Sequence, residues 1–142
     1  MGYYVSVELQ VKTRKTLSEI NIILNTHDMF KAHEAEINGK GTHRYLYYNR
    51  VDFKYSPESE AALLLMLLDL EPVHEINNGK QPPNLAFWDD LECHSWAYIV
   101  SFGQIQPMRA SWDYDTEARP LSRGDLLTTL SYSQRRNDAI GA

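Results

Sequence analysis

The sequence predicts an α+β fold with a mostly antiparallel sheet and helices packed largely on one face. Segments with alternating apolar residues recur along the chain, two pairs of them are close enough to form hairpins, and segments with helix start signals separate the pairs. Adjacent hairpins pair antiparallel, and helices then cover one face of the sheet. The expected order is β-α-β-β-α-loop-β-β-α. No repeat or linker divides residues 1–142, which we treat as a single domain.

The first part of the chain predicts a strand, a helix and a hairpin. Residues 3–12 alternate apolar and polar side chains, which is typical of a strand with one buried face. A capping-box sequence at 16–19 begins a helix that is expected to end near Met29. Residues 32–37 are weakly strand-like, and the Asn-Gly-Lys-Gly sequence at 38–41 favours a hairpin turn.

The strand that follows, residues 44–55, is expected to present two different faces. Strict alternation places most of its aromatic and apolar side chains on one face, namely Tyr45, Tyr47, Val51, Phe53 and Tyr55. The other face then mixes basic and aromatic side chains in the set Arg44, Leu46, Tyr48, Arg50, Asp52 and Lys54.

A second helix is predicted over residues 58–70. Ser56 is a capping residue, and Pro57 suits the first helical position because its missing N–H would have had no partner there. Residues 61–68 are apolar without a break, so this helix must be covered on several sides. Either the core covers it, or a second copy of the chain does so in a homo-oligomer.

The second half predicts a long loop, a hairpin and a last helix. Residues 72–91 contain turn sequences and no sustained periodicity, so we expect a long loop. Residues 94–102 and 108–114 alternate as two strands joined by a turn at 103–107. Ser122 is expected to cap a last helix.

Composition restricts the class of protein. Hydrophobic residues make up 43% of the chain and charged residues 23%, which is a normal mixture for a globular domain. Cys93 is the only cysteine, which excludes an intrachain disulfide and favours a reducing compartment, so we expect a cytoplasmic protein. The longest apolar run is far too short to span a bilayer, and no membrane contact is expected.

The sequence motifs that would indicate catalysis are absent. It contains no Cys-x-x-Cys, His-Glu-x-x-His, Walker or Gly-x-Ser-x-Gly sequence. We therefore predict no enzyme, no catalytic residue, no cofactor and no metal site. Cys93 and His94 are neighbours in a predicted strand and would point to opposite faces. A metal-dependent hydrolase that uses His27, His33 and Glu36 remains an alternative hypothesis.

Negative charge is concentrated in one part of the chain. The formal net charge is -5, and residues 69–92 contain six acidic residues against the single base Lys80. An acidic surface attracts basic proteins and repels phosphate backbones. We therefore expect a non-enzymatic protein-binding module that regulates or inhibits a basic partner, such as a nucleic-acid-binding protein. The predicted contacts are an aromatic pair among acids and a second acidic cluster: Phe87, Trp88, Asp89, Asp90, Glu92, Asp113, Asp115 and Glu117.

The alternative hypothesis is an RNA- or nucleotide-binding domain. Aromatic rings on a strand stack against bases while Arg and Lys side chains bind phosphates. The candidates share one predicted face of the long strand: Arg44, Tyr48, Arg50 and Lys54. Nucleic acid is the less favoured partner, because the chain is acidic and has no RNP sequence.

Overall fold

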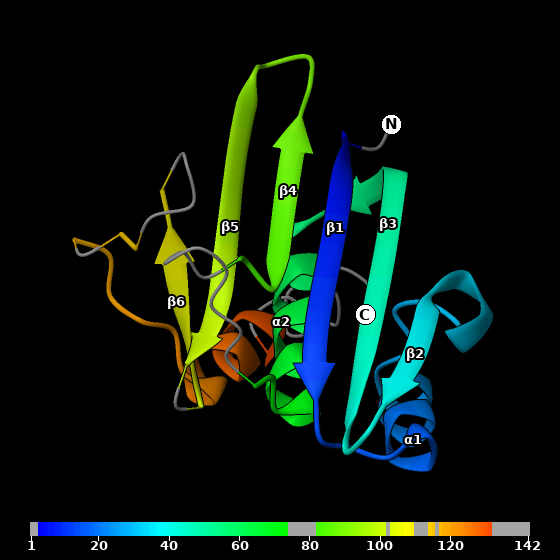
Figure 1. The fold of residues 1–142 in the computed structure, drawn as a ribbon. Helices are drawn as coiled ribbons and strands as arrows, with labels where there is room; N and C mark the ends of the chain where they lie inside the picture. The colour runs from blue at the N-terminus through cyan, green and yellow to red at the C-terminus, as the bar shows by residue number, and fades with distance from the viewer. Residues whose placement is uncertain (1–2, 74–81, 102, 110–113, 116, 132–142) are drawn as a thin grey trace, which may run out of the picture.

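In the computed structural model, the described residues 3–73, 82–101, 103–109, 114–115 and 117–131 form a six-stranded antiparallel sheet with helices on one side (Figure 1). The strand order is β2-β3-β1-β4-β5-β6. The strands are β1 Tyr3–Thr13, β2 Glu36–Lys40, β3 His43–Tyr55, β4 Leu85–Asp89, β5 His94–Ser101 and β6 Gln104–Met108. The helical segments are α1 Leu17–His27, the 3-10 turn η1 Ala32–Glu34, α2 Pro57–Leu70 and a helix at 123–131. The predicted α+β class is confirmed.

Each of the three α-helices in the described residues begins at a side-chain cap. The Thr16 hydroxyl accepts the Glu19 N–H at 3.2 Å, and the Glu19 carboxylate accepts the Thr16 N–H at 3.0 Å. The Ser56 hydroxyl caps α2 in the same way, and the Ser122 hydroxyl caps the helix at 123–131. These caps satisfy N–H groups that have no partner inside a helix, so the helix starts are determined locally.

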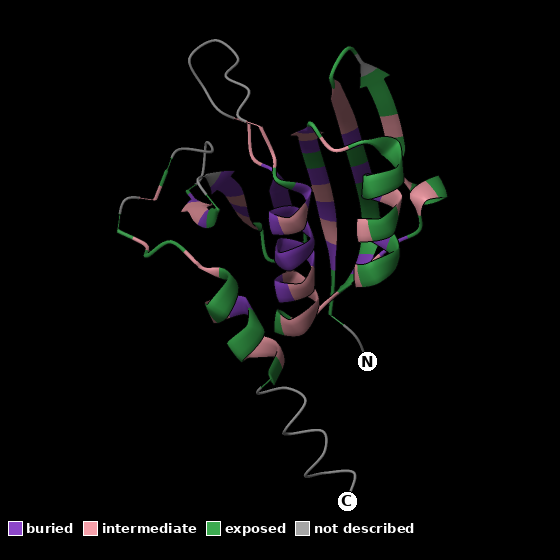
Figure 2. Ribbon diagram, turned by 90° about the horizontal axis from the view of Figure 1, so that it is seen from below, coloured by how far each residue is buried: buried purple, intermediate pink, exposed green. Residues whose placement is uncertain are grey.

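The main hydrophobic core lies between the sheet and the helices. Alternate residues of β1, from Val5 to Val11, are buried, and Figure 2 shows buried residues along α2 as well. Eight residues of α2 are buried inside the chain: Ala61, Leu63, Leu64, Leu65, Met66, Leu67, Leu68 and Leu70. The apolar surface of residues 58–70, which suggested a homo-oligomer, is therefore buried within a single copy of the protein. Among the described helices, none is long and apolar enough to cross a membrane.

The prediction of a loop over residues 72–91 is wrong where β4 lies. This strand pairs with β1 on one side and with β5 on the other. Leu85 and Phe87 pack into the main core, and Trp88 packs against a second apolar cluster on the opposite face of the sheet. A strand that packs on both faces shows no alternation, which is why its pattern was not recognised. Residues 74–81 lie outside the described part of the chain.

A β-bulge in β3 corrects the strict alternation predicted for residues 44–55. Phe53 lies opposite Val5 on β1, whereas Arg50 lies opposite Val7, so three residues of β3 correspond to two of β1. A bulge of this kind inserts one extra residue and reverses the face on which later side chains lie.

The two ends of β3 therefore follow opposite phases. Leu46 and Tyr48 are buried before the bulge, and Phe53 is buried after it. Tyr45 and Tyr47 consequently lie on the outer face of the sheet, opposite the helices. The prediction that Tyr45 and Tyr47 share a face with Phe53 is therefore wrong. It is Leu46 and Tyr48 that lie on the same face as Phe53.

Two hairpin turns are displaced from their predicted positions. β2 continues through most of the predicted turn at 38–41, and the chain reverses at Gly41, whose φ is 63°. Gly103, with a φ of 73°, turns the chain directly after β5. The next strand, β6, therefore begins at Gln104 and ends at Met108, where the predicted strand 108–114 was expected to begin. Glycine adopts these positive φ values without a steric cost. Residues 110–113 lie outside the described residues.

Candidate functional site

The turn between β4 and β5 presents an apolar side chain between two acidic residues. Leu91 is 97% exposed at this turn. Asp90 and Glu92, on either side of it, are also exposed. We call residues 90–93 the acidic turn. The combination of an apolar centre and a charged rim is typical of a protein contact.

A buried carboxylate holds the acidic turn in place. Asp89 is only 3% exposed, and its Oδ1 accepts the N–H groups of Leu91 at 3.1 Å and Glu92 at 3.2 Å. The Tyr3 hydroxyl of β1 donates a hydrogen bond to the other carboxylate oxygen. This bond lowers the pKa of Asp89, and the two N–H groups lower it further against the effect of burial. The same bond raises the pKa of Tyr3 to about 12.

The acidic turn also contains a strained backbone position. Cys93 has a φ of 50°, a left-handed conformation that costs free energy in a residue other than glycine. His94 follows it and pairs with Asp89 across β4 and β5. Cys93 thus lies in the turn and not in the strand, which corrects the predicted arrangement of the Cys93-His94 pair. The Asp89 hydrogen bonds and this strand pair together fix the conformation of the turn.

The structure separates the residues that were predicted as one contact surface. Phe87 is fully buried in the core, and Asp89 is buried beneath the turn that it holds. Trp88 is half-buried on the opposite face of the sheet. Only Asp90 and Glu92 of this group lie on the surface as predicted. Leu91 was missed, although a leucine between acids in a turn sequence was a usable signal.

The second predicted acidic cluster is partly neutralised within the chain. Arg109 Nε lies 3.3 Å from an Asp115 carboxylate oxygen, and Arg109 Nη2 lies 3.9 Å from a Glu117 carboxylate oxygen. Asp113, the third member of the cluster, lies outside the described residues. A basic partner would have to compete with Arg109 for these carboxylates, so the acidic turn is the better candidate.

The predicted nucleic-acid face is not a single surface. Tyr48 is buried and its ring stacks on Phe30 with ring centres 4.0 Å apart. Arg50 is paired with Asp52 at 2.8 Å. Lys54 is exposed, but it lies beyond the bulge, and Arg44 binds backbone carbonyl oxygens near the start of β3. These four side chains therefore do not form a base-stacking platform.

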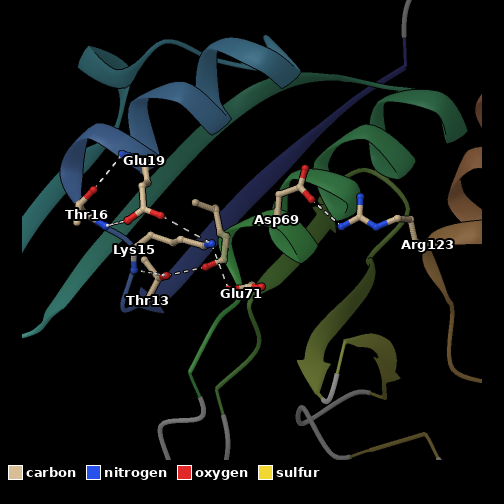
Figure 3. A network of polar contacts seen from close by, with 8 residues as sticks. Thr13, Lys15, Thr16, Glu19, Asp69, Glu71 and Arg123 are labelled. Atoms are coloured by element: carbon tan, nitrogen blue, oxygen red, sulfur yellow. Dashed lines mark hydrogen bonds and ion pairs between the residues drawn. The ribbon is translucent and has the colours of Figure 1, made fainter.

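A polar network joins α1 to the end of α2 (Figure 3). Lys15 Nζ lies 3.2 Å from Glu71 and 4.0 Å from Glu19. The Thr13 hydroxyl donates to the Leu70 carbonyl oxygen at 2.6 Å. The charged and hydrogen-bonding groups of this network are partners for one another, and we interpret the network as a structural connection between β1 and the two helices.

A second part of the network places a histidine beside a carboxylate. Asp69 Oδ2 lies 2.6 Å from His27 Nε2, and Asp69 Oδ1 lies 2.6 Å from Arg123. Asp69 therefore links α1, α2 and the helix at 123–131. His33 lies in η1 and Glu36 begins β2, and both are exposed. Within the described ranges, no group of three or more His, Cys, Asp or Glu side chains is placed to hold a metal ion.

Glu60 in α2 accepts hydrogen bonds from three aromatic side chains. Tyr55 OH and Trp96 Nε1 donate to Oε2 at 2.9 and 3.0 Å, and Tyr98 OH donates to Oε1 at 2.5 Å. Burial and the Glu60 charge raise the pKa of Tyr98 above its ordinary value. The carboxylate thus connects α2 to β3 and β5, which is a structural role.

Comparisons with family models, with curated proteins and with solved structures give no significant match. The chemistry of the surface therefore carries the functional argument. Among the described residues, two exposed features are taken further below: the acidic turn, and the outer face of the sheet at β1 and β3.

Proposed function

We propose that this protein is a non-enzymatic acidic binding module that contacts a basic protein partner through the acidic turn. The observation that carries the proposal is the 97% exposure of Leu91 between two exposed carboxylates. An apolar anchor surrounded by charges supplies affinity at the centre of an interface and electrostatic steering at its rim.

Leu91 supplies enough free energy to matter for binding. Full burial of a leucine side chain contributes about 1.5–3 kcal/mol, which corresponds to roughly tenfold to a hundredfold in Kd. Asp90 and Glu92 would approach lysine or arginine side chains of the partner, and this attraction raises the association rate most strongly at low salt.

The internal support of the turn favours binding over a purely structural role. Asp89, itself bonded to Tyr3, accepts the backbone N–H of Leu91, so the backbone of the turn is supported from within the chain. An ordered contact loop loses less conformational entropy on binding. Backbone strain is found often at functional sites, where the surrounding structure maintains it.

A regulator or inhibitor is the form of this function that we favour. A compact acidic chain that covers a basic surface would block whatever that surface binds, such as a nucleic acid. We place this action in the cytoplasm, because Cys93 is an exposed free thiol at the contact itself and a reducing compartment keeps it unmodified.

The test is recovery of a protein partner from cell extract with purified wild-type and variant chains, with and without nuclease. Leu91→Ala should reduce recovery of a stoichiometric protein band, and Asp90→Lys with Glu92→Lys should reduce it further. The matched controls are Ile22→Ala, which is 64% exposed on α1, and the pair Asp115→Lys with Glu117→Lys.

Both control variants should recover the partner as the wild type does. Equal recovery by the Leu91→Ala chain would contradict the proposal. So would a band that disappears after nuclease treatment, since that result would indicate a nucleic-acid bridge.

A further inference from the structure

The outer face of the sheet carries a second exposed site near the end of β1. In Figure 1 the helices lie behind the sheet, so the face formed by β1, β2 and β3 that the viewer sees is the one opposite the helices. A hollow of about 130 Å³ lies on this face. Its walls come from the end of β1, the start of β3, and the segments on either side of residues 74–81.

Two tyrosines form one wall of the hollow. Tyr45 and Tyr47 lie on the same side of β3, because Leu46 between them is buried in the core. Asn49 donates a side-chain hydrogen bond to the Tyr47 hydroxyl at 3.2 Å, which restricts this ring. Pro82 and Pro83 line another wall. Flat tyrosine rings, with apolar proline surface lining the same hollow, suit a planar ring.

The hollow also has a positively charged side chain at its wall. Lys12 Nζ lies 5.6 Å from the centre of the Tyr45 ring, and Lys12 also lines the hollow. Arg14 lines an adjoining hollow that shares Val73 with the first. Within the described residues, neither Lys12 nor Arg14 forms an ion pair, whereas Lys15 is held by Glu19 and Glu71. In that part of the chain, neither cation has a carboxylate partner, and an anionic ligand would supply one.

We propose that this hollow binds a mononucleotide, with its base against Tyr45 and Tyr47 and its phosphate at Lys12 and Arg14. The volume of about 130 Å³ admits one planar ring, while the ribose and phosphate extend over the rim toward the two cations. Aromatic stacking contributes affinity for any base, and a charged hydrogen bond to the phosphate adds to it.

The surrounding charge favours a single nucleotide over a long strand. Glu8 and Glu36 lie on the same outer face of β1 and β2, and the whole chain has a net charge of -5. Successive phosphates of an RNA strand that crossed this face would meet these carboxylates, and the repulsion would cost affinity. The site is separate from the acidic turn, so the two proposals stand independently.

The experiment is titration of the protein with each of the four ribonucleoside 5′-monophosphates and with the matching nucleosides, followed by NMR chemical shifts. Shifts should concentrate at Tyr45, Tyr47 and Lys12, with a Kd that is roughly millimolar or tighter. Tyr47→Ala should weaken binding of nucleotide and nucleoside alike by at least about fivefold. Lys12→Gln should weaken nucleotide binding by roughly fivefold to tenfold and leave nucleoside binding unchanged.

The matched control is Val51→Ala, since Val51 is exposed on β3 but does not line the hollow. This variant should bind as the wild type does, and thermal melts should establish that every variant is folded. The proposal is overturned if none of the four nucleotides shifts these residues at millimolar concentration, or if Lys12→Gln weakens nucleoside and nucleotide equally. The proposal is also overturned if a single-stranded oligoribonucleotide binds much more tightly than the mononucleotides and its affinity falls with salt as steeply as several phosphate contacts require. The ligand would then be RNA.

Discussion

Replacement of Glu60 should destabilise the protein more than replacement of any exposed acid. The Glu60→Ala change removes the acceptor of three hydrogen bonds, from Tyr55, Trp96 and Tyr98. A hydrogen bond to a charged group contributes about 1.5–3 kcal/mol when buried. These donors are partly buried, so we assign about 1 kcal/mol to each and expect a loss of about 3 kcal/mol in the free energy of unfolding.

The loss should be easy to measure by urea and thermal unfolding followed by circular dichroism. For a chain of this length, 1 kcal/mol shifts the Tm by roughly 3–4 °C, so Glu60→Ala should lower the Tm by about 10 °C. The matched control is Glu117→Ala, because the Glu117 side chain is 89% exposed. That change should cost less than about 0.5 kcal/mol.

A second substitution separates the charge from the hydrogen bonds. Glu60→Gln keeps one acceptor oxygen for Tyr55 and Trp96, and the Tyr98 hydroxyl can rotate to accept from the new amide. We expect this change to cost about 1 kcal/mol. A Glu60→Ala loss no greater than that of Glu117→Ala would refute the reasoning, because it would mean that solvent replaces all three bonds at no cost.

The same contact makes a prediction for alkaline pH. The pKa of Tyr98 is raised in the folded protein by burial and by Glu60. A raised tyrosine pKa means that this contribution to stability is complete below about pH 10, the ordinary tyrosine value, and is lost as pH rises above it. Tyr98→Phe should therefore flatten the decline of stability above about pH 10.

The remaining predictions concern other parts of the fold. Tyr3→Phe should remove the tyrosine that ionises near pH 12 in an ultraviolet titration and should raise the pKa of Asp89. Hydrogen bonds from His27 and Arg123 hold the Asp69 pKa below 3.8 against burial, so Asp69→Asn should destabilise the protein above about pH 4 and less so as pH falls further. Sedimentation at two concentrations should give one species of 16.4 kDa, because the apolar residues of α2 are used internally.

Helices were predictable from the sequence because their signals are local. A cap at Thr16, Ser56 or Ser122 depends on a residue three positions later, and the apolar stripe that follows repeats within one turn. The first strand was equally clear, since β1 buries one face only. These elements need no knowledge of the neighbours that they meet in the fold.

The candidate site was harder to predict because it depends on partners distant in sequence. Asp89 and Asp90 are adjacent acids, yet the first is buried beneath Tyr3 and the second is exposed. Their difference comes from the pairing of β4 with β1, which local composition does not encode. Tyr48 was placed on the wrong face for a related reason, because a bulge changes the side-chain phase without a distinctive residue type.

The position of β1 has a consequence for synthesis of the protein. β1 lies in the middle of the sheet, with Tyr3 opposite Tyr55 on β3 and Ser6 opposite Trp88 on β4. β1 precedes both of its neighbours in the chain, and a ribosome delivers the second of them, β4, some eighty residues after β1. Until then one edge of β1 has no strand beside it, and such edges invite association with other chains. Nascent chains that stop before β4 should therefore depend on chaperones to remain unaggregated.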